Sequence, residues 1–342
     1  MNSNMDRRRV FSQGFMQRSR LLVVLGVIAL ISACSLPRIV LFKDSADPLQ
    51  EFTLEGSERD KILLIPLQGM ISDSPQKSFL KSAPSMVQHV MSQLQKAEKD
   101  KRIKAILLKV NSPGGTITAS DILYHEILEY KKRTGAKIII SMLDLAASGA
   151  YYLSLPADMI MAHPTTLTGS IGVIFLRPKV HGLMDKIGLG IDVVKSGKNK
   201  DMGSPFRESS REEEEMMQKS VNDFGERFIH LVQKHRQLKQ PALDEISTAR
   251  VFTADEALQL GLVDKIGYLR DAVQETKKMA GLAQDAKVVV YRRTKVPDDN
   301  YYNISGMATG TAHIPVINLA LPEVLDIAGF YYIWAGAIRA DK

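Results

Sequence analysis

A β-branched apolar run followed at once by a cluster of small residues is the feature that most constrains this chain. The run Ile138–Ile140 comes shortly after Gly135, and its composition predicts a buried strand. The small residues Ala146–Ala150 follow, with Ser148 at their centre. Such residues allow a sharp strand-to-helix turn, and a helix that begins near Gly149 directs its free N–H groups toward whatever binds beside the serine. Ser148 is therefore either a helix N-cap or the nucleophile of an acyl-transfer enzyme.

A second turn of small residues follows another apolar run. The run Ile103–Val110 predicts a strand, and the segment NSPGGT at Asn111–Thr116 leads into a predicted helix over 118–133. Two consecutive glycines after a proline make a tight turn with exposed N–H groups, so Gly114 or Gly115 can donate to an oxyanion. A single Pro-Gly-Gly turn is a weak signal. Two such turns, each between a strand and a helix, favour the nucleophile over the cap.

A serine nucleophile needs a base, and two residues could serve. His163 could complete a Ser-His-Asp arrangement with Asp144 or Asp158. Lys200, in the segment SGKNKDMGSP, is the other candidate, with Lys198 as a less favoured alternative. A lysine acts as a base only when desolvation or nearby positive charge lowers its pKa from about 10.4 toward neutrality. The residues alone leave the choice between histidine and lysine open.

Five ordered segments resemble the signal peptide peptidase A family, of the protease IV type. They are NSPGGT, LAASGAYY, TLTGSIGV, SGKNKDMGSPFR and ARVFTADEALQLGLVDKIG, and the resemblance covers about residues 61–281. It implies a serine peptidase with a Ser-Lys dyad on a Clp-protease/crotonase-like α/β fold, in which stacked βα units surround a mostly parallel sheet.

The resemblance also implies a role for each residue of the site. Ser148 is implied to be the nucleophile, Lys200 the general base and Ser170 the hydroxyl that hydrogen-bonds the lysine amine. The implied oxyanion donors are backbone N–H groups of the Pro-Gly-Gly turn and of the residue after the nucleophile, namely Gly114, Gly115 and Gly149. His163 is then expected to be structural. No metal, nucleotide or other cofactor is expected.

The predicted activity is that of a membrane-tethered serine endopeptidase acting on cleaved signal peptides or other membrane-associated peptides. An extended substrate could pair with backbone beside the site. The short form of the family, with one catalytic unit, is expected to form a ring- or dome-shaped homo-oligomer in which serine and lysine can meet across a subunit boundary. Two alternatives share the fold: a crotonase-like acyl-CoA enzyme, which needs no Ser-Lys pair, and a catalytically silent membrane scaffold.

The N-terminal residues predict export to a membrane. Residues 1–20 carry five arginines and one aspartate, so without them the net charge falls from +7 to +3, and composition gives no indication of nucleic-acid binding. The apolar run at 21–31 and the small residues before Cys34 complete an export signal. Cys34 ends a segment that resembles the bacterial lipobox. The alternatives are a transmembrane anchor reaching Phe42 and a simple cleaved signal peptide. Lipoprotein and anchor both hold the catalytic domain at the bacterial cell membrane, on its extracytoplasmic side.

The remaining domain boundaries follow from composition, and the predicted strands and helices follow from the alternation of strand-like and helix-like apolar patterns. The expected domains are a targeting segment at 1–42, a linker at 43–60, a peptidase domain at 61–285 and a C-terminal strand with an apolar aromatic tail at 286–342. Within these, strands are predicted at 61–67, 103–110, 137–142, 159–162, 170–175, 191–195 and 288–291, with helices at 84–99, 118–133, 180–187 and from 209 onward. The acidic run Glu212–Glu215 is expected to be solvated at a helix N-terminus rather than to bind metal. The aromatic residues at 330–334 are expected to pack on the domain or a neighbouring subunit, or else to rest at a membrane interface.

Overall fold

The computed structural model describes residues 48–78, 81–303 and 328–337. The predicted targeting segment at 1–42, Cys34 included, lies outside these residues, as does most of the apolar tail. In the described ranges, the helices are all too short or too polar to cross a membrane.

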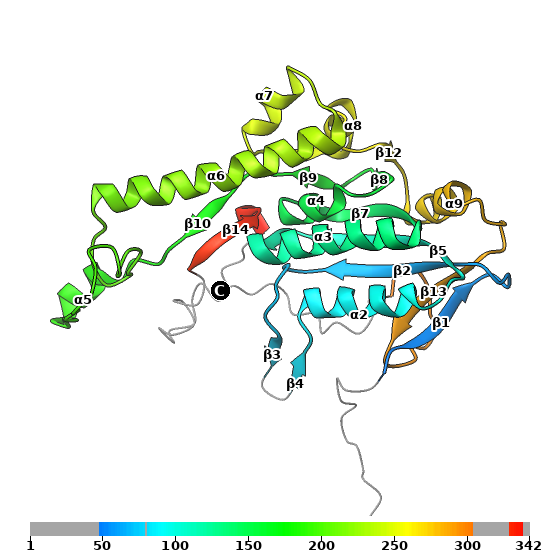
Figure 1. Cartoon of the computed structure of the whole chain (residues 1–342), viewed down its shortest axis with the longest axis horizontal. Helices are drawn as coiled ribbons and strands as arrows, with labels where there is room; N and C mark the ends of the chain where they lie inside the picture. The colour runs from blue at the N-terminus through cyan, green and yellow to red at the C-terminus, as the bar shows by residue number, and fades with distance from the viewer. Residues whose placement is uncertain (1–47, 79–80, 304–327, 338–342) are drawn as a thin grey trace, which may run out of the picture. The chain divides into compact units, whose positions relative to one another are not determined.

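A nine-stranded sheet forms the centre of the domain (Figure 1). Its main path runs β1-β13-β2-β5-β7-β8-β12, and β9 and β11 branch from β7. The pairings along β13, β2, β5, β7, β8 and β12 are parallel, as is that of β9 with β7. The prediction of a mostly parallel sheet is therefore confirmed. The strand bounds are β1 (Gln50–Glu55), β2 (Lys61–Gln68), β5 (Ile103–Ser112), β7 (Lys137–Ala147), β8 (Met159–Ala162), β9 (Leu167–Gly169), β11 (Val251–Thr253), β12 (Lys265–Ile266) and β13 (Lys287–Arg292).

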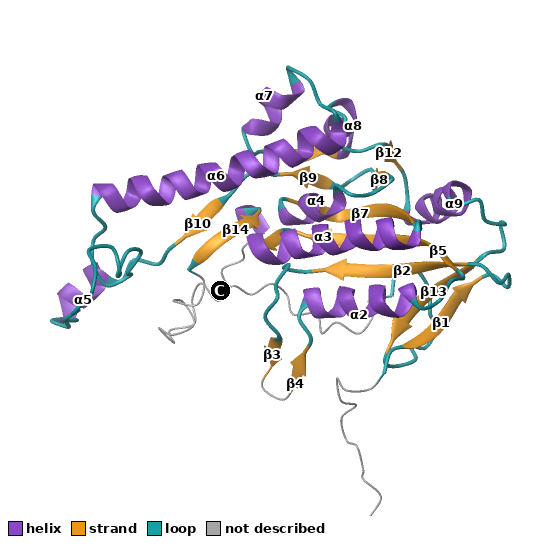
Figure 2. Ribbon diagram, in the orientation of Figure 1, coloured by secondary structure: helices purple, strands orange, loops and turns teal. Residues whose placement is uncertain are grey.

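Helices cover both faces of this sheet (Figure 2). On β2, Leu63 and Ile65 face the layer that holds α2 (Met86–Glu98) and α3 (Ile117–Thr134), together with α4 (Gly149–Ser154). Ile62 and Leu64 face α9 (Leu269–Met279) on the other side. A parallel strand buried on both faces needs apolar residues at consecutive positions, which explains the consecutive apolar residues at 62–65 in β2, 105–108 in β5 and 138–140 in β7.

Three segments differ from their sequence-based predictions. Gln50–Glu55, within the expected linker, form β1, and Phe52 and Leu54 pack on the sheet while their polar neighbours stay more exposed, as suits an edge strand. The strand predicted at 170–175 forms only at its end: β9 stops at Gly169, the backbone turns through a positive φ at Ser170, and β10 (Ile174–Leu176) begins at Ile174. Residues 191–195, predicted as a strand, have no regular secondary structure and are exposed.

A long helix extends beyond the sheet (Figure 1). This helix, α6 (Arg211–Arg236), begins with a capping box formed by Ser210 and Glu213. Phe228 and Val232 in its C-terminal half are buried in the core, whereas its N-terminal end lies near α5 (His181–Ile187), away from the sheet. Two short helices, α7 (Ala242–Ser247) and α8 (Ala254–Gln259), follow.

Two small sheets complete the domain. One is the hairpin of β3 (Gln76–Ser78) and β4 (Lys81–Ala83). The other has the order β10-β14-β6 and joins β6 (Gly114–Thr116) to the C-terminal strand β14 (Gly329–Ile333), which the 3₁₀ turn η2 (Ala335–Ala337) follows. Residues 330–333 therefore pack on the domain, one of the two placements expected for the aromatic tail.

Candidate active site

Ser148 occupies the sharp turn between β7 and α4. Its backbone has φ 55° and ψ −116°, a combination that residues with a Cβ seldom adopt. The Ser148 N–H donates to the Gly169 carbonyl at 2.7 Å, and the side chain makes no capping bond to α4. The residue is only 1% exposed. Ser148 is thus held in a strained conformation with its hydroxyl not engaged as a helix cap.

Ser170 lies beside Ser148. Strands β7 and β9 pair in parallel with Ala147 opposite Gly169, so the two serines are the next residues on adjacent strands, which are typically about 4.8 Å apart. Ser170 also has a positive φ of 51°, and its N–H donates to the Arg250 carbonyl at 2.8 Å. The structure therefore brings these two predicted site residues together.

Three predicted oxyanion glycines meet at the same turn. A Cβ added to Gly114 would lie 2.7 Å from the Gly149 nitrogen, and one added to Gly149 would lie 3.2 Å from the Gly115 nitrogen. Gly114 also has a φ of +99°, which disfavours any side chain. Its N–H donates to Ser112 Oγ at 3.1 Å, leaving Gly115 as the other donor of this turn. The backbone amides needed for an oxyanion hole thus lie next to the nucleophile candidate.

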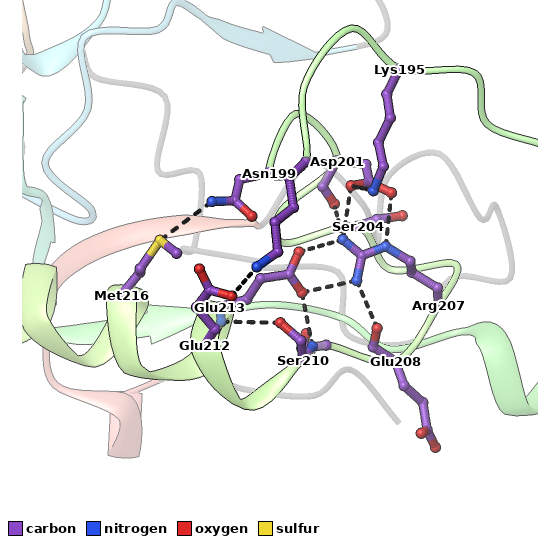
Figure 3. Close-up of polar contacts among 12 residues, drawn as sticks. Lys195, Asn199, Asp201, Ser204, Arg207, Glu208, Ser210, Glu212, Glu213 and Met216 are labelled. Atoms are coloured by element: carbon purple, nitrogen blue, oxygen red, sulfur yellow. Dashed lines mark hydrogen bonds and ion pairs between the residues drawn. The ribbon is translucent and has the colours of Figure 1, made fainter.

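Lys200 lies in a different part of the molecule, on an exposed loop at 195–207. Figure 3 shows how this loop is fastened to the start of α6. Arg207 bridges Asp201, at 2.8 Å, and Glu213, and the Arg207 guanidinium together with Lys195 holds the pKa of the Asp201 carboxyl well below its usual range. A polar network therefore gives the lysine loop a defined shape.

The loop's three lysines differ in their contacts. Lys195 pairs with Asp201 at 2.6 Å, and Lys198 pairs with Glu212. The Lys200 side chain makes no ion pair or hydrogen bond to any residue in the described ranges, and it is exposed. Of the three, Lys200 is the amine left available to a further partner.

Helix α6 separates Lys200 from Ser148 within one chain. Glu213 anchors the lysine loop at the start of α6, and Phe228 of the same helix packs on Tyr152 of α4 with ring centroids 4.9 Å apart. A helix rises about 1.5 Å per residue, so Glu213 and Phe228 are about 22 Å apart along the axis. Ser148 is one helical turn from Tyr152, whose N–H donates to the Ser148 carbonyl. One chain alone does not bring the two predicted dyad residues together.

The alternative Ser-His-Asp arrangement is not assembled either. His163 contacts Thr165 at 2.8 Å and stacks edge-on against Tyr268. Asp144 accepts from Asn111, and Asp158 pairs with Lys131 at 3.2 Å. Asp158 also accepts from the Ile138 N–H at 2.9 Å and from Lys137 at 3.4 Å. In the described part of the chain the polar side-chain contacts of His163 are local ones, and they give it a structural role.

Sequence reasoning missed the strand that lies over this site. β14 pairs antiparallel with β6, placing Tyr332 opposite Gly115. The Trp334 N–H also donates to the Pro113 carbonyl at 2.9 Å. The aromatic and β-branched residues at 330–333, which are types enriched in strands, could have indicated a strand, but not its partner.

Large apolar side chains are exposed near the lysine loop. Those more than 45% exposed in and after α5 are Leu183, Ile187, Leu189, Ile191, Val193 and Val194. An apolar surface of this extent is typical of a protein–protein interface.

The acidic run at the start of α6 is used for ion pairing. Glu212 pairs with Lys198, and Glu213 with Arg207, which together with the Ser210 N–H lowers the pKa of the Glu213 carboxyl to about 2. Among the described residues, histidine, cysteine, aspartate and glutamate side chains form no cluster suited to holding a metal ion.

A strained serine beside converging backbone amides, at a strand-to-helix turn, is the arrangement of hydrolases that form an acyl intermediate on serine.

Comparison with known proteins agrees with this interpretation of the site. Residues 130–283 match peptidase family S49, and residues 80–166 match the Clp protease family. A candidate signal peptide peptidase SppA of Enterococcus faecium is 36% identical over 252 residues, which are 74% of this chain and 73% of that protein.

Two further relatives extend the comparison. A candidate protease of Methanocaldococcus jannaschii is 38% identical over 194 residues, 57% of this chain and 61% of that one. A mutant of the 1510-N membrane-bound stomatin-specific protease aligns in structure with a TM-score of 0.42 and 16% identity, covering 65% of this chain and 86% of that one. The chain belongs to peptidase family S49, and it is a serine peptidase. This membership favours the peptidase over the acyl-CoA enzyme among the functions predicted from the sequence.

Proposed function

We propose that this peptidase is a membrane-tethered endopeptidase that hydrolyses cleaved signal peptides or other membrane-associated peptides through Ser148 and Lys200. We also propose that the βα units of this domain are arranged as in the Clp-protease/crotonase fold. The substrate class is supported by the name of the Enterococcus faecium relative and by the export signal in the sequence. Tethering rests on the apolar run at 21–31 and on Cys34, which we propose to be lipidated outside the cytoplasm.

In the proposed reaction, neutral Lys200 removes the proton from Ser148 as the Ser148 oxygen attacks a peptide carbonyl. The N–H groups of Gly115 and Gly149 stabilise the oxyanion, with Gly114 setting the shape of the turn. Lys200 then gives its proton to the leaving amine, and afterwards activates the water that hydrolyses the acyl-enzyme. Ser170 accepts or donates a hydrogen bond at the lysine amine and keeps it directed at Ser148.

We further propose that the dyad forms between two copies of this chain in a homo-oligomer. A single observation carries this proposal. Glu213, which anchors the lysine loop, and Phe228, which packs on Tyr152 near Ser148, are about 22 Å apart along the axis of α6. The free amine of Lys200 and the exposed apolar side chains after α5 support it, because a second copy could cover the apolar surface and receive the lysine. Burial at that interface would also provide the desolvation that a lysine base needs.

Peptide hydrolysis by the full chain tests the proposal. We expect Ser148→Ala and Lys200→Ala to abolish cleavage of a fluorogenic peptide, and His163→Ala to retain it. Lys198→Ala is the matched control, because it removes a neighbouring amine that is already paired with Glu212. An active Lys200→Ala with an inactive His163→Ala would replace the dyad by a Ser-His site. Loss of cleavage in Lys198→Ala alone would move the base to Lys198.

A further inference from the structure

The strand that leads to Ser148 changes its partner before it reaches the active site. An earlier stretch of β7 pairs with β8, whereas its last three residues pair with β9. The register against β5 shifts between these stretches. Met142 lies opposite Val110, but Ala146, four residues further along β7, lies opposite Ser112, only two residues further along β5. The two extra residues form a bulge, which separates the serine end of β7 from the regular part of the sheet.

Polar side chains hold the irregular stretch of β7. Thr166 Oγ1 donates to the Leu143 carbonyl at 2.5 Å, and Asn111 Oδ1 accepts from the Leu145 N–H at 3.2 Å. A bulge takes backbone groups out of the regular ladder, so these groups need partners of another kind. Both bonds hold the bulge itself, which lies before the serine turn.

Thr168 makes a similar bond where the serine turn begins. Its hydroxyl donates to the Ala146 carbonyl at 2.6 Å, and the residue is fully buried. Thr168 lies opposite Ala146 of β7 on one side and opposite Phe252 of β11 on the other. Ala146 stands two residues before Ser148, and Thr168 stands two residues before Ser170. The bond therefore joins the two segments that end in the site serines.

The relative position of the two serines depends on this junction. Ser148 and Ser170 both have a positive φ, so each backbone leaves its strand direction just after the junction. Only one further bond joins the segments beyond Thr168 in the described structure, from the Ser148 N–H to the Gly169 carbonyl at 2.7 Å. A Cβ added to Gly169 would overlap the Phe252 ring, so this backbone packs closely against β11. The Thr168 hydroxyl thus helps to fix how Ser170 is offset from Ser148.

We propose that Thr168 is a positioning residue of the dyad: its hydroxyl fixes the offset between Ser148 and Ser170, and thereby the direction of the lysine base. This rests on the proposed function, in which Ser170 hydrogen-bonds the Lys200 amine. Hydrogen bonds are directional, so a shift of Ser170 turns the amine away from the Ser148 hydroxyl. A misplacement of about 1 Å can cost about a hundredfold in rate. Thr168 is buried and donates its proton to Ala146, so it acts through the serines and not on the substrate.

Replacement of the Thr168 hydroxyl tests this role. Thr168→Val keeps the branched shape without the donor, and should lower kcat for peptide hydrolysis by the full chain by about ten- to a hundredfold with KM unchanged. Thr168→Ser keeps the donor and should restore kcat to near the wild-type value. Thr168→Cys has a weaker donor, so its kcat should lie between the two. If Thr168→Val does not fold, the comparison of cysteine with serine carries the test.

An activated ester distinguishes misplacement of the lysine from a loss of stability. In peptide hydrolysis the lysine takes the serine proton and also protonates the leaving amine, whereas a nitrophenolate leaving group needs no proton. Thr168→Val should therefore raise the ratio of nitrophenyl ester to peptide hydrolysis, as Ser170→Ala should, because both changes misdirect the amine. A variant that is only destabilised loses both activities in equal proportion, since only its folded fraction changes.

Thr276→Val is the matched control. Thr276 is fully buried in α9 on the other face of the sheet, and its hydroxyl donates to the Ala272 carbonyl at 2.6 Å, so the same change there should leave kcat and the ratio unaltered. An unchanged kcat or an unchanged ratio in Thr168→Val, or a Thr168→Ser variant as slow as Thr168→Val, would overturn this inference while leaving the peptidase intact. If wild type cleaved no peptide at all, the proposed function would fail and this inference with it.

Discussion

The strained backbone of Ser148 predicts that the active-site serine lowers the stability of the folded chain. Its φ of 55° and ψ of −116° lie in a region that glycine occupies freely and that costs other residues about 1–3 kcal/mol. Ser148→Gly relieves this strain, whereas Ser148→Ala keeps it, and both remove the hydroxyl. Glycine also gains about 0.4–1 kcal/mol of freedom in the unfolded chain, which offsets part of the benefit.

The expected net effect is that Ser148→Gly is more stable than Ser148→Ala by about 1–2 kcal/mol. For a domain of this size, that corresponds to a melting temperature higher by about 2–8 °C. Thermal unfolding of the two full-length variants, followed by circular dichroism at one protein concentration, measures the difference. Both variants lack the nucleophile, so activity plays no part in the comparison.

A matched pair of substitutions in the same helix provides the control. Ser154 is fully buried in α4 and helical, and its hydroxyl donates to the Ala150 carbonyl. At this position the order should reverse, with Ser154→Gly less stable than Ser154→Ala by about 0.5–1 kcal/mol. If glycine were equal to or worse than alanine at Ser148 as well, the turn would hold no strain and the reasoning would be refuted.

Three further predictions follow from the geometry. Burial, reinforced by Arg293, lowers the pKa of His89 to about 4. Because the unfolded histidine titrates near 6.5, the unfolded state takes up the proton first as the pH falls, so wild type should lose about 2 kcal/mol more stability than His89→Gln between pH 7.5 and pH 5. Urea unfolding at the two pH values measures the difference. Arg207→Ala should lower kcat several-fold by loosening the lysine loop, and it should also lower the melting temperature, because it leaves the Glu213 carboxylate, only 4% exposed, without its guanidinium partner. Arg211→Ala, which breaks an exposed pair with Glu215 within α6, should change neither. An unchanged kcat in Arg207→Ala would contradict the positioning role. Gly149→Ala should reduce kcat by about 10²–10³, since its Cβ would crowd the Ser120 hydroxyl and shift an oxyanion donor, and a fully active variant would exclude this amide from the site.

The sequence was sufficient to predict those strands of the fold that are buried on both faces of the sheet. The strands β2, β5 and β7 are buried on both faces in their central parts, so their consecutive apolar residues could be recognised without their partners. Small residues between each strand and helix likewise indicated the turns at Gly114 and Ser148. The N-terminus of α6 was predictable because a capping box is a local signal.

Features that depend on distant pairing were not predictable in this way. β1 lies in a stretch whose composition suits a linker, and it becomes a strand because β13 offers an edge. The place of β14 depends on a pairing between Gly115 and Tyr332, residues far apart in the chain, and periodicity gives no information about such a partner. The position of Lys200 depends on the length and direction of α6, which local sequence does not relate to Ser148.

Mixing two inactive variants tests the central claim most directly. Ser148→Ala retains the lysine and Lys200→Ala retains the serine, so neither is expected to cleave peptide alone. If the dyad forms across subunits, co-assembly in equal amounts should restore activity to about a quarter of the wild-type level, because about one interface in four joins an intact serine to an intact lysine. If the mixture stays inactive while each variant still assembles, the two residues do not meet across a subunit boundary and the account is wrong.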